Sequence, residues 1–567
     1  DIRNHVAFYG DFFRCLREMG APSIDCLTSV PATVPWQIAR LIGSAADLDG
    51  KPVTMSETSD FQQNYRADGD TRPVQVITDA DVRGTCNRLM LGGITTITSY
   101  YTWLGIDTTQ LRRLNEYVGR VSTMITGGHQ VTDIAVVYPV ETMWTRFEPA
   151  RHNATDSPGA DEVRQIFDAV STGLYAARRD FTYLDSRTLA EASVENGALT
   201  HGDMRWRVVV LPCVDTLPDA AWLNLAEFQR SGGVVVAAGA RPVNSAREFP
   251  SPRIEQLGES MFGVGDEPLV VRNDGGAGIY LPGSAVGLLP TVLDGVLESD
   301  AAVGESRSPV RVTHRLVDGR HVYYLINDSG VPATETVSLA TSGGGQQWDL
   351  ATGEVTDIAS GQGVSLTLEP YGGAILTFAE ARAPKLTLPD AGSLPGMVIG
   401  SLPEVQPVEG HGEFVDGGIA SDDDLSTAER PVWQVTGTLT KTDVDTHQFS
   451  GFEFPAAIDL TGAESIVIDT WVPGGQTASA QVLIILHEQG GGMYFGTVGR
   501  SLAAPGHAET YMPISKLDLA GWAEDANGRL DLDQIVRISV GWGGYFGTEG
   551  ETVAFSLAAP RVARRDR

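Results

Sequence analysis

Glu57 is the carboxylate whose sequence surroundings best suit catalysis. It stands in segment 51–60, a short apolar and β-branched run that ends in polar residues. After a helix-length gap, segment 93–103 repeats the pattern and closes with Ser99, Tyr100, Tyr101 and Trp103. A carboxylate at the end of one buried strand, with hydroxyls and rings at the end of the next, suits cleavage of a glycosidic bond. The alternative is that Glu57 only caps a strand at the surface.

Such cleavage needs two carboxylates. One protonates the leaving oxygen, and the other attacks the anomeric carbon or activates water. Asp25, at the end of the preceding strand-like run, is the best second candidate, and its alternative role is that of a hydrogen-bonded strand residue. Asp60 lies three residues after Glu57 and suits a turn or cap. We therefore predict Glu57 as nucleophile or base and leave the acid/base residue open.

Aromatic side chains follow the same strands and could hold a sugar ring. Tyr100, Tyr101 and Trp103 offer a stacking face and hydroxyl donors, because sugar C–H faces pack on aromatic rings. Core packing is the alternative for each tyrosine. Trp36, which follows Pro31 and Pro35 in a loop after the first strand, is predicted to line the same cleft. We expect these four side chains and Asp25 to bind substrate.

The elements that must position these residues alternate between helix and strand. Strand-like runs lie at 22–27, 53–55 and 94–99, and helical apolar spacing marks the segments between and around them. This alternation is typical of a parallel sheet covered by helices. Three strands in about 125 residues are half of what a barrel of about 250 residues needs, and a half barrel exposes strand edges. We expect residues 1–126 to be the C-terminal part of a TIM barrel that begins upstream; a complete small α/β domain is the alternative.

The rest of the chain predicts a multidomain α/β plus all-β protein. Residues 127–304 alternate buried strands and helices and indicate a flavodoxin-like α/β domain without a GxGxxG or Walker loop. Residues 305–380 change to a period of two, as in a small antiparallel β-sandwich. The Pro-, Gly- and Ser-rich stretch 381–406 indicates a linker. Residues 407–567 are again all β and predict a jelly-roll β-sandwich.

Aromatic residues beside glycines suggest that this last domain binds glycans. Trp522, Trp542 and Tyr545 lie near turn glycines, where rings tend to be presented on loops rather than packed in mid-strand. We predict that these three side chains bind carbohydrate. The alternative is that they fill the core of the sandwich.

Composition and charge restrict the partners. The 567 residues, 42% of them hydrophobic, exceed what one core can hold, so several domains are expected. The net charge of −31 argues against nucleic acid and anionic membranes and suits neutral ligands such as sugars. No apolar run reaches the roughly 18 residues that would suggest a membrane span.

The cysteines and the acidic clusters point to no cofactor. Cys26 and Cys213 lie in apolar runs, so we expect buried thiols rather than a disulfide frame or a metal site. Residues 422–424 are three consecutive aspartates that could donate oxygens to Ca²⁺, although a solvated loop is the simpler interpretation.

The domain order resembles that of family 42 β-galactosidases and other glycoside hydrolases with clan-A-type barrels. Several local patterns are similar to those of α-L-rhamnosidases of the family 106 type. They are the Ser56-Glu57 strand end, the glycine-initiated strand before Ser99-Tyr-Tyr, the helix 115–120 leading into 134–139, and the run 206–218. The tail resembles a carbohydrate-binding module.

This resemblance has implications for the catalytic residues. Counting back from Tyr100 as the end of strand 8, residues 1–126 would hold strands 6–8, and Glu57 matches the strand-7 glutamate that is the nucleophile in clan-A barrels. Their acid/base glutamate, on strand 4, has no match here, so this chain alone is expected to be inactive. The resemblance also implies a secreted or cell-surface bacterial protein.

Three functional hypotheses remain open. The first is a glycoside hydrolase, or its C-terminal part, that acts on oligosaccharides or polysaccharides of plant or microbial origin. The second is a non-catalytic carbohydrate-binding or cell-surface protein. The third is an amidotransferase-like or flavodoxin-like enzyme, which is weak because Cys213 does not lie in a glycine-flanked nucleophile turn. The substrate sugar, the stereochemical outcome and a possible homo-oligomer stay open.

Overall fold

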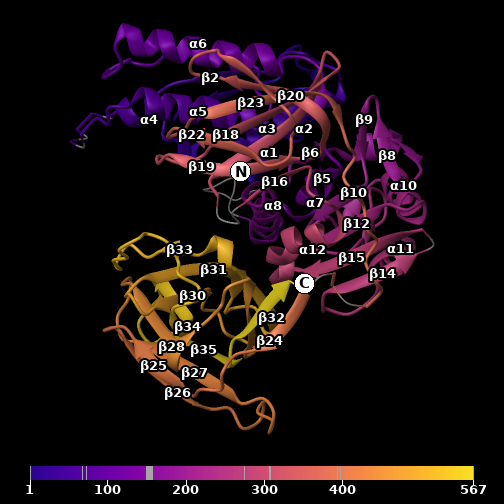
Figure 1. Ribbon diagram of the computed structural model, residues 1–567. Helices are drawn as coiled ribbons and strands as arrows, with labels where there is room; N and C mark the ends of the chain where they lie inside the picture. Colours follow the sequence, from indigo (N-terminus) through magenta and orange to yellow (C-terminus); the bar gives the residue numbers. More distant parts are fainter. Residues whose placement is uncertain are drawn as a thin grey trace. The chain divides into compact units, whose positions relative to one another are not determined.

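The fold is known from a computed structural model that divides into two compact units (Figure 1). Unit 1 comprises residues 1–280 and 294–393, and unit 2 comprises residues 281–293 and 394–567. The structure describes residues 2–66, 68, 69, 71, 73–148, 157–273, 275–304, 308–392, 394, 395 and 397–565. Within these ranges, no helix combines the length and the apolar character that crossing a bilayer requires.

The chain begins with a three-stranded parallel sheet in the order β1-β2-β3. Its strands are β1 (Ser23–Cys26), β2 (Met55–Thr58) and β3 (Thr96–Ser99). The helices of this segment are α1 (Ile2–Tyr9), α2 (Phe12–Glu18), η1 (Pro31–Thr33), α3 (Trp36–Leu48), α4 (Phe61–Asn64), α5 (Asp79–Leu91) and α6 (Thr108–Ile125). Helices α2, α3, α5 and α6 pack side by side in chain order.

Local sequence signals explain where these helices start and how closely they pack. Capping boxes begin α5 and α6, where Thr78 and Asp107 each accept a hydrogen bond from a first-turn backbone N–H. Gly43 in α3 lies against the turn after α5, because a Cβ there would come within 2.6 Å of the carbonyl oxygen of Gly92. Helix α3 can therefore approach that turn only with glycine at this position.

The expected mixture of α/β and β architecture is confirmed, but a barrel is not seen. The first sheet has three strands and is not closed, and among the described residues β1 and β3 pair only with β2. The parallel direction places the carboxyl ends of all three strands at one edge. The incomplete barrel therefore stays a proposal.

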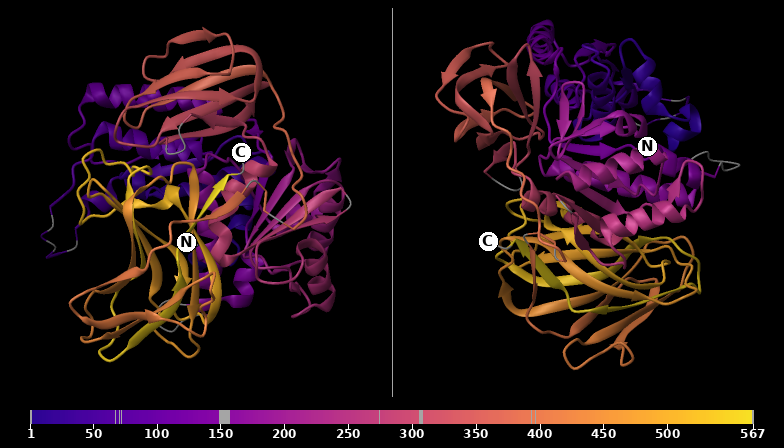
Figure 2. Two further views of the ribbon diagram at one scale, coloured as in Figure 1. Left: turned by 60° about the horizontal axis from the view of Figure 1, so that its bottom comes forward. Right: turned by 90° about the vertical axis from the view of Figure 1, so that its right-hand side faces the viewer.

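The second α/β region is built on a six-stranded sheet in the order β14-β15-β12-β10-β5-β6. Its parallel strands β6 (Thr182–Leu184), β5 (Ile134–Val137), β10 (Val208–Pro212) and β12 (Val234–Gly239) have the chain order 2-1-3-4, as in doubly wound folds. The antiparallel hairpin β14 (Leu269–Asn273) and β15 (Gly276–Pro282) extends it. Figure 2 shows this sheet and its helices in magenta and pink.

Helices and small strands complete this region. The helices are α7 (Val140–Arg146), α8 (Pro158–Ala176), α9 (Ser186–Glu191), α10 (Asp219–Arg230) and α11 (Pro252–Phe262). The following η2 (Gly283–Leu288) and the start of α12 (Leu289–Val296) belong to unit 2. The small strands are β7 (Ser193–Glu195), β8 (Ala198–His201), β9 (Met204–Trp206), β11 (Thr216–Leu217) and β13 (Asn244–Ser245). Cys26 and Cys213 are buried free thiols, as predicted.

A small β-sandwich follows in unit 1. One sheet has the order β21-β20-β23-β18-β17-β4 and the other the order β16-β19-β22. The strands are β4 (His129–Gln130), β16 (Ala301–Val303), β17 (Val310–Val317), β18 (Arg320–Asn327), β19 (Ala333–Leu339), β20 (Thr341–Asp349), β21 (Val355–Ile358), β22 (Val364–Leu368) and β23 (Gly373–Ala381). Strand β4 comes from far upstream and forms an edge of the larger sheet.

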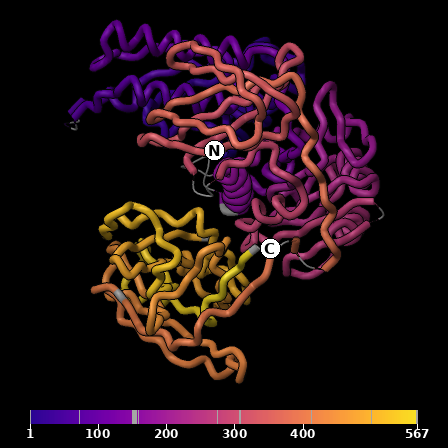
Figure 3. The backbone as a smooth tube through the Cα atoms, in the orientation of Figure 1, coloured from indigo at the N-terminus to yellow at the C-terminus, as the bar shows by residue number. Residues whose placement is uncertain are grey.

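Helices α5 and α6 also pack on the outer face of this larger sheet. Met90, Tyr117 and Val121 share an apolar cluster with Val322 and Tyr324. The salmon strands and the purple helices accordingly lie side by side in Figures 1 and 3. This packing fixes the helices that carry the first sheet.

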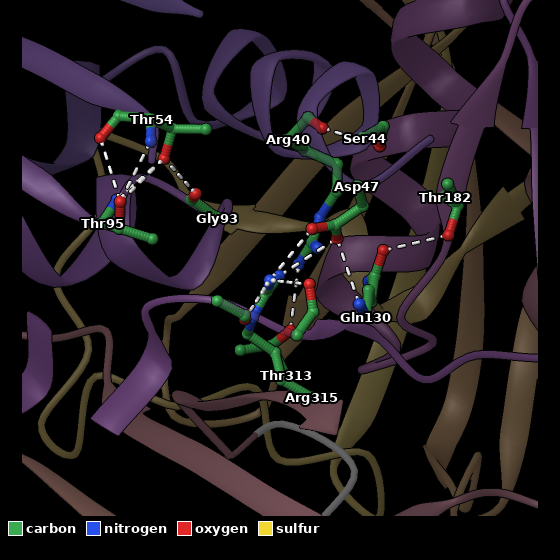
Figure 4. A network of polar contacts seen from close by, with 12 residues as sticks. Arg40, Ser44, Asp47, Thr54, Gly93, Thr95, Gln130, Thr182, Thr313 and Arg315 are labelled. Atoms are coloured by element: carbon green, nitrogen blue, oxygen red, sulfur yellow. Dashed lines mark hydrogen bonds and ion pairs between the residues drawn. The ribbon is translucent and has the colours of Figure 1, made fainter. Parts of the chain in front are cut away.

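A buried polar network joins α3, β4 and β17 (Figure 4). Asp47 accepts hydrogen bonds from Nη1 and Nη2 of Arg315, at 3.1 and 2.9 Å, and from the backbone N–H of Gln130 at 3.0 Å. The side chains of Asp47 and Arg315 are 4% and 6% exposed. The network links segments that are far apart in the sequence.

Unit 2 is a β-sandwich of two antiparallel sheets. One has the order β24-β36-β29-β35-β27-β26, with β32 also paired to β29, and the other has the order β25-β28-β34-β30-β31-β33. The strands are β24 (Met397–Ser401), β25 (Pro407–His411), β26 (Val415–Ser421), β27 (Val432–Leu439), β28 (Thr446–Ile458), β29 (Ala463–Val472), β30 (Gln481–Glu488), β31 (Met493–Ser501), β32 (Gly506–Pro513), β33 (Asp518–Leu519), β34 (Ile535–Tyr545), β35 (Thr552–Ala558) and β36 (Arg561–Arg565), with η3 at Ile514–Lys516. Strand β24 lies within the stretch expected to be linker and pairs with β36.

Candidate functional site

Asp25, Glu57 and Thr98 form a row across the first sheet. In the parallel register Glu57 lies opposite Asp25 on β1 and opposite Thr98 on β3. Neighbouring strands lie roughly 4.8 Å apart, so the two carboxylates arise from adjacent positions. The structure thus brings together the two carboxylates that the sequence singled out.

This row lies on the open face of the sheet. Cys26 and Thr58, one position further along, point to the opposite face and are buried. Asp25 and Thr98 are exposed and Glu57 is half-buried. Parallel sheets are normally covered on both faces. Here the face that carries the carboxylates is available to a ligand or to further protein.

Buried polar side chains beneath this face tie the strand ends together. The Asp60 carboxylate, 2% exposed, accepts hydrogen bonds from the Thr102 hydroxyl at 2.5 Å and from its backbone N–H at 3.1 Å. Gln63 accepts from the backbone N–H of Ser29 at 2.9 Å and donates to the Thr28 hydroxyl at 3.2 Å. These two side chains connect the loops after all three strands.

Gln63 was not foreseen from the sequence. A glutamine five residues beyond a strand gives no local signal of its own, and its partners lie 34 and 35 positions away. Asp60 was predicted to serve as a turn or cap residue, but its side chain makes no cap bond to α4 and bonds Thr102 in the loop after β3 instead. Together they hold in one arrangement the loops at the carboxyl ends of β1, β2 and β3, which form the rim that carries Glu57.

The aromatic residues of the rim divide into two sets. Tyr100 is 47% exposed, and its backbone N–H donates to the Thr58 carbonyl at 3.1 Å, which fixes it at the strand end. Tyr101, in contrast, is buried in the core and lies 4.9 Å from the half-buried Trp103 ring. The expectation that Tyr101 offers a stacking face is corrected, because successive side chains of an extended segment point in opposite directions.

Trp36 is placed elsewhere than expected. Its ring stacks on Tyr175 of α8 at 4.1 Å, with Phe181 6.2 Å away. The side chain therefore packs between α3 and the second α/β region. Its expected place in the Glu57 cleft is corrected to this packing role.

A cavity of about 280 Å³ lies beside β3. Its lining includes Ser99, Tyr101 and Trp103 together with Cys86 of α5 and Val118 of α6. The Tyr101 hydroxyl is buried, and burial raises its pKa, while hydrogen bonding with the side chains of Ser29 and Thr58 opposes that shift.

The surroundings of Cys213 do not suit a nucleophile. It follows β10 with a φ of 52°, a left-handed conformation that strains a non-glycine residue. Burial raises the pKa of its thiol to about 12, although the neighbouring Arg146 guanidinium opposes the shift. The protonated thiol is unreactive. This arrangement gives no support to an amidotransferase-like function.

In unit 2 the three predicted carbohydrate-binding aromatics have different surroundings. Trp542 is fully buried among core residues of the sandwich, so the expectation of an exposed ring is corrected. Tyr545 is half-buried, and its hydroxyl donates to Glu551 at 2.9 Å. Trp522 is 64% exposed, and its ring lies 5.2 Å from that of Phe495. Trp522 and Phe495 thus form an aromatic pair that a ligand can reach.

A cavity of about 340 Å³ lies on the sheet of β28, β30 and β34 in unit 2. Arg537 donates to Glu453 at 2.9 Å and to the Ser539 hydroxyl at 3.1 Å. His487 shares that hydroxyl at 2.9 Å, and burial lowers its pKa to about 4, which keeps the ring neutral at pH 7. The cavity offers both donors and acceptors.

No metal centre is formed by the described residues. Among them, no group of three or more His, Cys, Asp or Glu side chains is arranged to hold an ion. Asp422 accepts from the Ser556 hydroxyl at 2.6 Å, and Asp423 accepts from the Ser421 hydroxyl at 2.8 Å. These aspartates have local hydrogen-bond partners.

Comparisons with known proteins give weak structural likenesses. Neither a protein-family model nor a curated protein matches the sequence. Among solved structures, a rhamnosidase from Novosphingobium sp. PP1Y aligns with 96% of this chain and 52% of its own at 12% identity and a TM-score of 0.46. A GH42 β-galactosidase from G. stearothermophilus aligns with 66% of this chain and 61% of its own at 11% identity and a TM-score of 0.45.

A third likeness concerns a carbohydrate-binding module. A family 11 module from Clostridium thermocellum, solved with a mixed-linked tetrasaccharide, aligns with 30% of this chain and 94% of its own at 15% identity and a TM-score of 0.22. This chain spans about half of the rhamnosidase and about three fifths of the galactosidase. All three TM-scores are below 0.5, so the proposals below rest on the sites themselves.

Proposed function

We propose that this chain is part of a glycoside hydrolase that acts on plant or microbial glycans, with Glu57 as catalytic nucleophile or base. The observation that carries the proposal is the row of Asp25, Glu57 and Thr98 on the open face of a parallel sheet. Barrel and open α/β enzymes build their sites at the carboxyl ends of parallel strands. Glu57 and Tyr100 both belong to that edge.

Each side chain then has a role that follows from its chemistry. Glu57 attacks the anomeric carbon or removes a proton from water, and Asp25 on the next strand binds the substrate's hydroxyls. Tyr100, which is exposed, offers a ring face and a hydroxyl. Asp60 and Gln63 act through other groups, since they hold the loops in place.

A larger barrel-type sheet accounts for the open face and the free edges of β1 and β3. Further strands would cover the polar face and pair the edges. The general acid would come from those strands, as the second of the two carboxyl groups that glycoside cleavage needs. In this proposal the chain alone lacks proton donation to the leaving group and is inactive.

The substitution Glu57→Gln tests the proposal. It should abolish hydrolysis of a panel of nitrophenyl glycosides in the longest protein that contains this chain, while circular dichroism stays unchanged. Azide should restore turnover to Glu57→Ala if Glu57 is a nucleophile, because the small anion replaces the missing carboxylate. Glu116→Gln, an exposed carboxylate on α6, is the matched control and should keep full activity. Retention of most of kcat by Glu57→Gln would exclude this role.

We also propose that unit 2 binds glycan through the Trp522–Phe495 pair and the Arg537 cavity. Stacked rings and paired polar groups suit the apolar faces and hydroxyls of sugars. Affinity electrophoresis over a panel of soluble polysaccharides measures this binding. Trp522→Ala should remove the retardation and Phe546→Ala, an equally exposed ring beyond β34, should keep it. If no glycan retards the unaltered chain, unit 2 has only a structural role.

A further inference from the structure

A second cavity in unit 1 lies at one end of the small β-sandwich. It has a volume of about 260 Å³ and is enclosed by β4, the start of β5, the β8–β9 hairpin and the segment around Asp300. His129, His314 and His321 line it, together with Thr313 and Arg382. None of these side chains belongs to the Glu57 site.

Three of its side chains form a hydrogen-bonded chain. Nδ1 of His314 lies 2.9 Å from Oδ2 of Asp300, and Nε2 of His314 lies 2.9 Å from Nδ1 of His321. His314 is 2% exposed and its ring stacks on Tyr323 at 3.9 Å. The Tyr323 hydroxyl donates to the other oxygen of Asp300 at 3.1 Å. Asp300 is therefore held in place and can only accept from His314.

This series of hydrogen bonds determines which nitrogen of His321 faces a ligand. An ionised carboxylate only accepts, so His314 carries its proton on Nδ1 and, when neutral, presents a lone pair at Nε2. His321 must then donate from Nδ1, which leaves its own Nε2 as an acceptor. Burial and the neighbouring His314 lower the pKa of His321, so the ring is neutral at pH 7. Within the described residues, Nε2 of His321 has no hydrogen-bond partner.

Several charged side chains around the cavity are paired with an opposite charge. Glu298 pairs with Arg382 at 2.6 Å, and Asp133 pairs with Arg207 at 2.5 Å. Asp180 pairs with Arg40 at 2.8 Å and accepts from the Thr313 hydroxyl at 2.7 Å. On the β8–β9 hairpin, Asp203 and Arg205 carry opposite charges. Arg179 pairs with Asp294 at 2.5 Å, and Asp300 accepts hydrogen bonds from His314 and Tyr323. Because most of these charges already have partners, the cavity favours a neutral ligand over an ion.

A buried amide adds a donor. Gln130 is 2% exposed and lines the same cavity. Its Oε1 accepts from the Thr182 hydroxyl at 3.0 Å, whereas its Nε2 has no partner among the described residues. The lining thus holds an acceptor on His321 and a donor on Gln130, a combination that complements a hydroxyl group.

We propose that this cavity is a binding site for a small, neutral, polyhydroxylated molecule of about one sugar ring, in which Nε2 of His321 accepts a hydrogen bond from a ligand hydroxyl. Its volume lies just below the usual range of about 300–1,000 Å³ for drug-sized ligands, which suits a monosaccharide rather than an oligosaccharide. The site would be separate from hydrolysis at Glu57 and from glycan binding by unit 2.

The test uses the full chain with Glu57→Gln and Trp522→Ala, which disable the two sites of the proposed function. Histidine labelled with ¹³C at Cε1 gives one NMR signal for each of the 10 histidines, and single substitutions assign them. Methyl α-L-rhamnoside, methyl β-D-galactoside and methyl β-D-glucoside serve as neutral probes and sodium glucuronate as the charged probe. We expect at least one neutral probe to shift the His321 and His129 signals saturably.

His321→Phe keeps a ring of similar size and removes the acceptor. It should weaken binding at least tenfold, while His447→Phe, an exposed histidine of unit 2, should leave it unchanged. Binding should also weaken below the pKa of His321, because protonation of Nε2 removes the lone pair that accepts the ligand hydroxyl. The titratable groups around this ring are His314, Asp300 and His129. If no neutral probe shifts these signals, if His321→Phe binds equally well, or if only glucuronate binds, the proposal is overturned.

Discussion

Asp47→Asn should destabilise unit 1 far more than the loss of an exposed ion pair. The substitution keeps the shape of the side chain but removes the charge that faces Arg315. Both side chains are almost fully buried, at 4% and 6% exposure. Breaking a buried pair by removing one partner costs about 3–5 kcal/mol, since an uncompensated charge remains inside. We expect the lower end, about 3 kcal/mol, because asparagine can still accept one hydrogen bond.

The matched control is Glu298→Gln, which breaks the pair with Arg382. These side chains are 41% and 51% exposed, and exposed pairs contribute about 0–1 kcal/mol. A double variant, Asp47→Leu with Arg315→Met, should recover much of the loss, because replacing both partners by apolar groups leaves no buried charge.

Hydrogen exchange measured by mass spectrometry resolves the effect locally. A loss of about 3 kcal/mol corresponds to roughly 150-fold faster exchange of the amides in α3 and β17. Peptides from unit 2 provide an internal reference. If Asp47→Asn accelerates exchange no more than Glu298→Gln does, or if the double variant is worse than the single one, the reasoning from burial is refuted.

Two further predictions concern a buried acid and a buried ring. Burial raises the pKa of Glu141 on α7 to about 7, so the folded state holds its proton more tightly than the unfolded state and stability should fall as pH rises from about 4.5 to 7. Glu141→Gln should therefore raise the urea midpoint by an amount equivalent to about 3 kcal/mol at pH 8 and leave it unchanged at pH 4; an equal effect at both values would contradict this. Trp542→Ala should destabilise unit 2 by about 3–5 kcal/mol in thermal unfolding, whereas Trp522→Ala should change it by less than about 1 kcal/mol; the reverse order would contradict the assignment of core and surface.

The sequence indicated several features correctly because they depend on short-range patterns. Alternating helical and strand-like segments predicted the mixed α/β and β architecture. The same pattern placed Asp25 and Glu57 at the ends of neighbouring strands, and the parallel register confirms their adjacency. Apolar surroundings predicted that Cys26 and Cys213 are buried.

The sequence around Trp542 contains a strand pattern that indicates a core position, although the neighbouring glycines suggest a turn. Ile538, Val540 and Trp542 alternate along β34 and all face the core of the sandwich. A period of two is the usual mark of one strand face, and it outweighs the turn character of the neighbouring glycines. Trp522 has no such alternation around it and is exposed.

Only the tertiary structure decided which distant groups meet. Local periodicity determines which face of an element is apolar, and it carries no information on the partner that covers that face. Asp47 meets Arg315 across 268 positions, and β4 joins β17 at the edge of another sheet. The cavity of His314 and His321 likewise exists only because the small sandwich packs beside the second α/β region. The sequence by itself determined the strand-end carboxylates and the alternation of elements, while long-range packing decided the open sheet face, the buried ion pair and the second cavity.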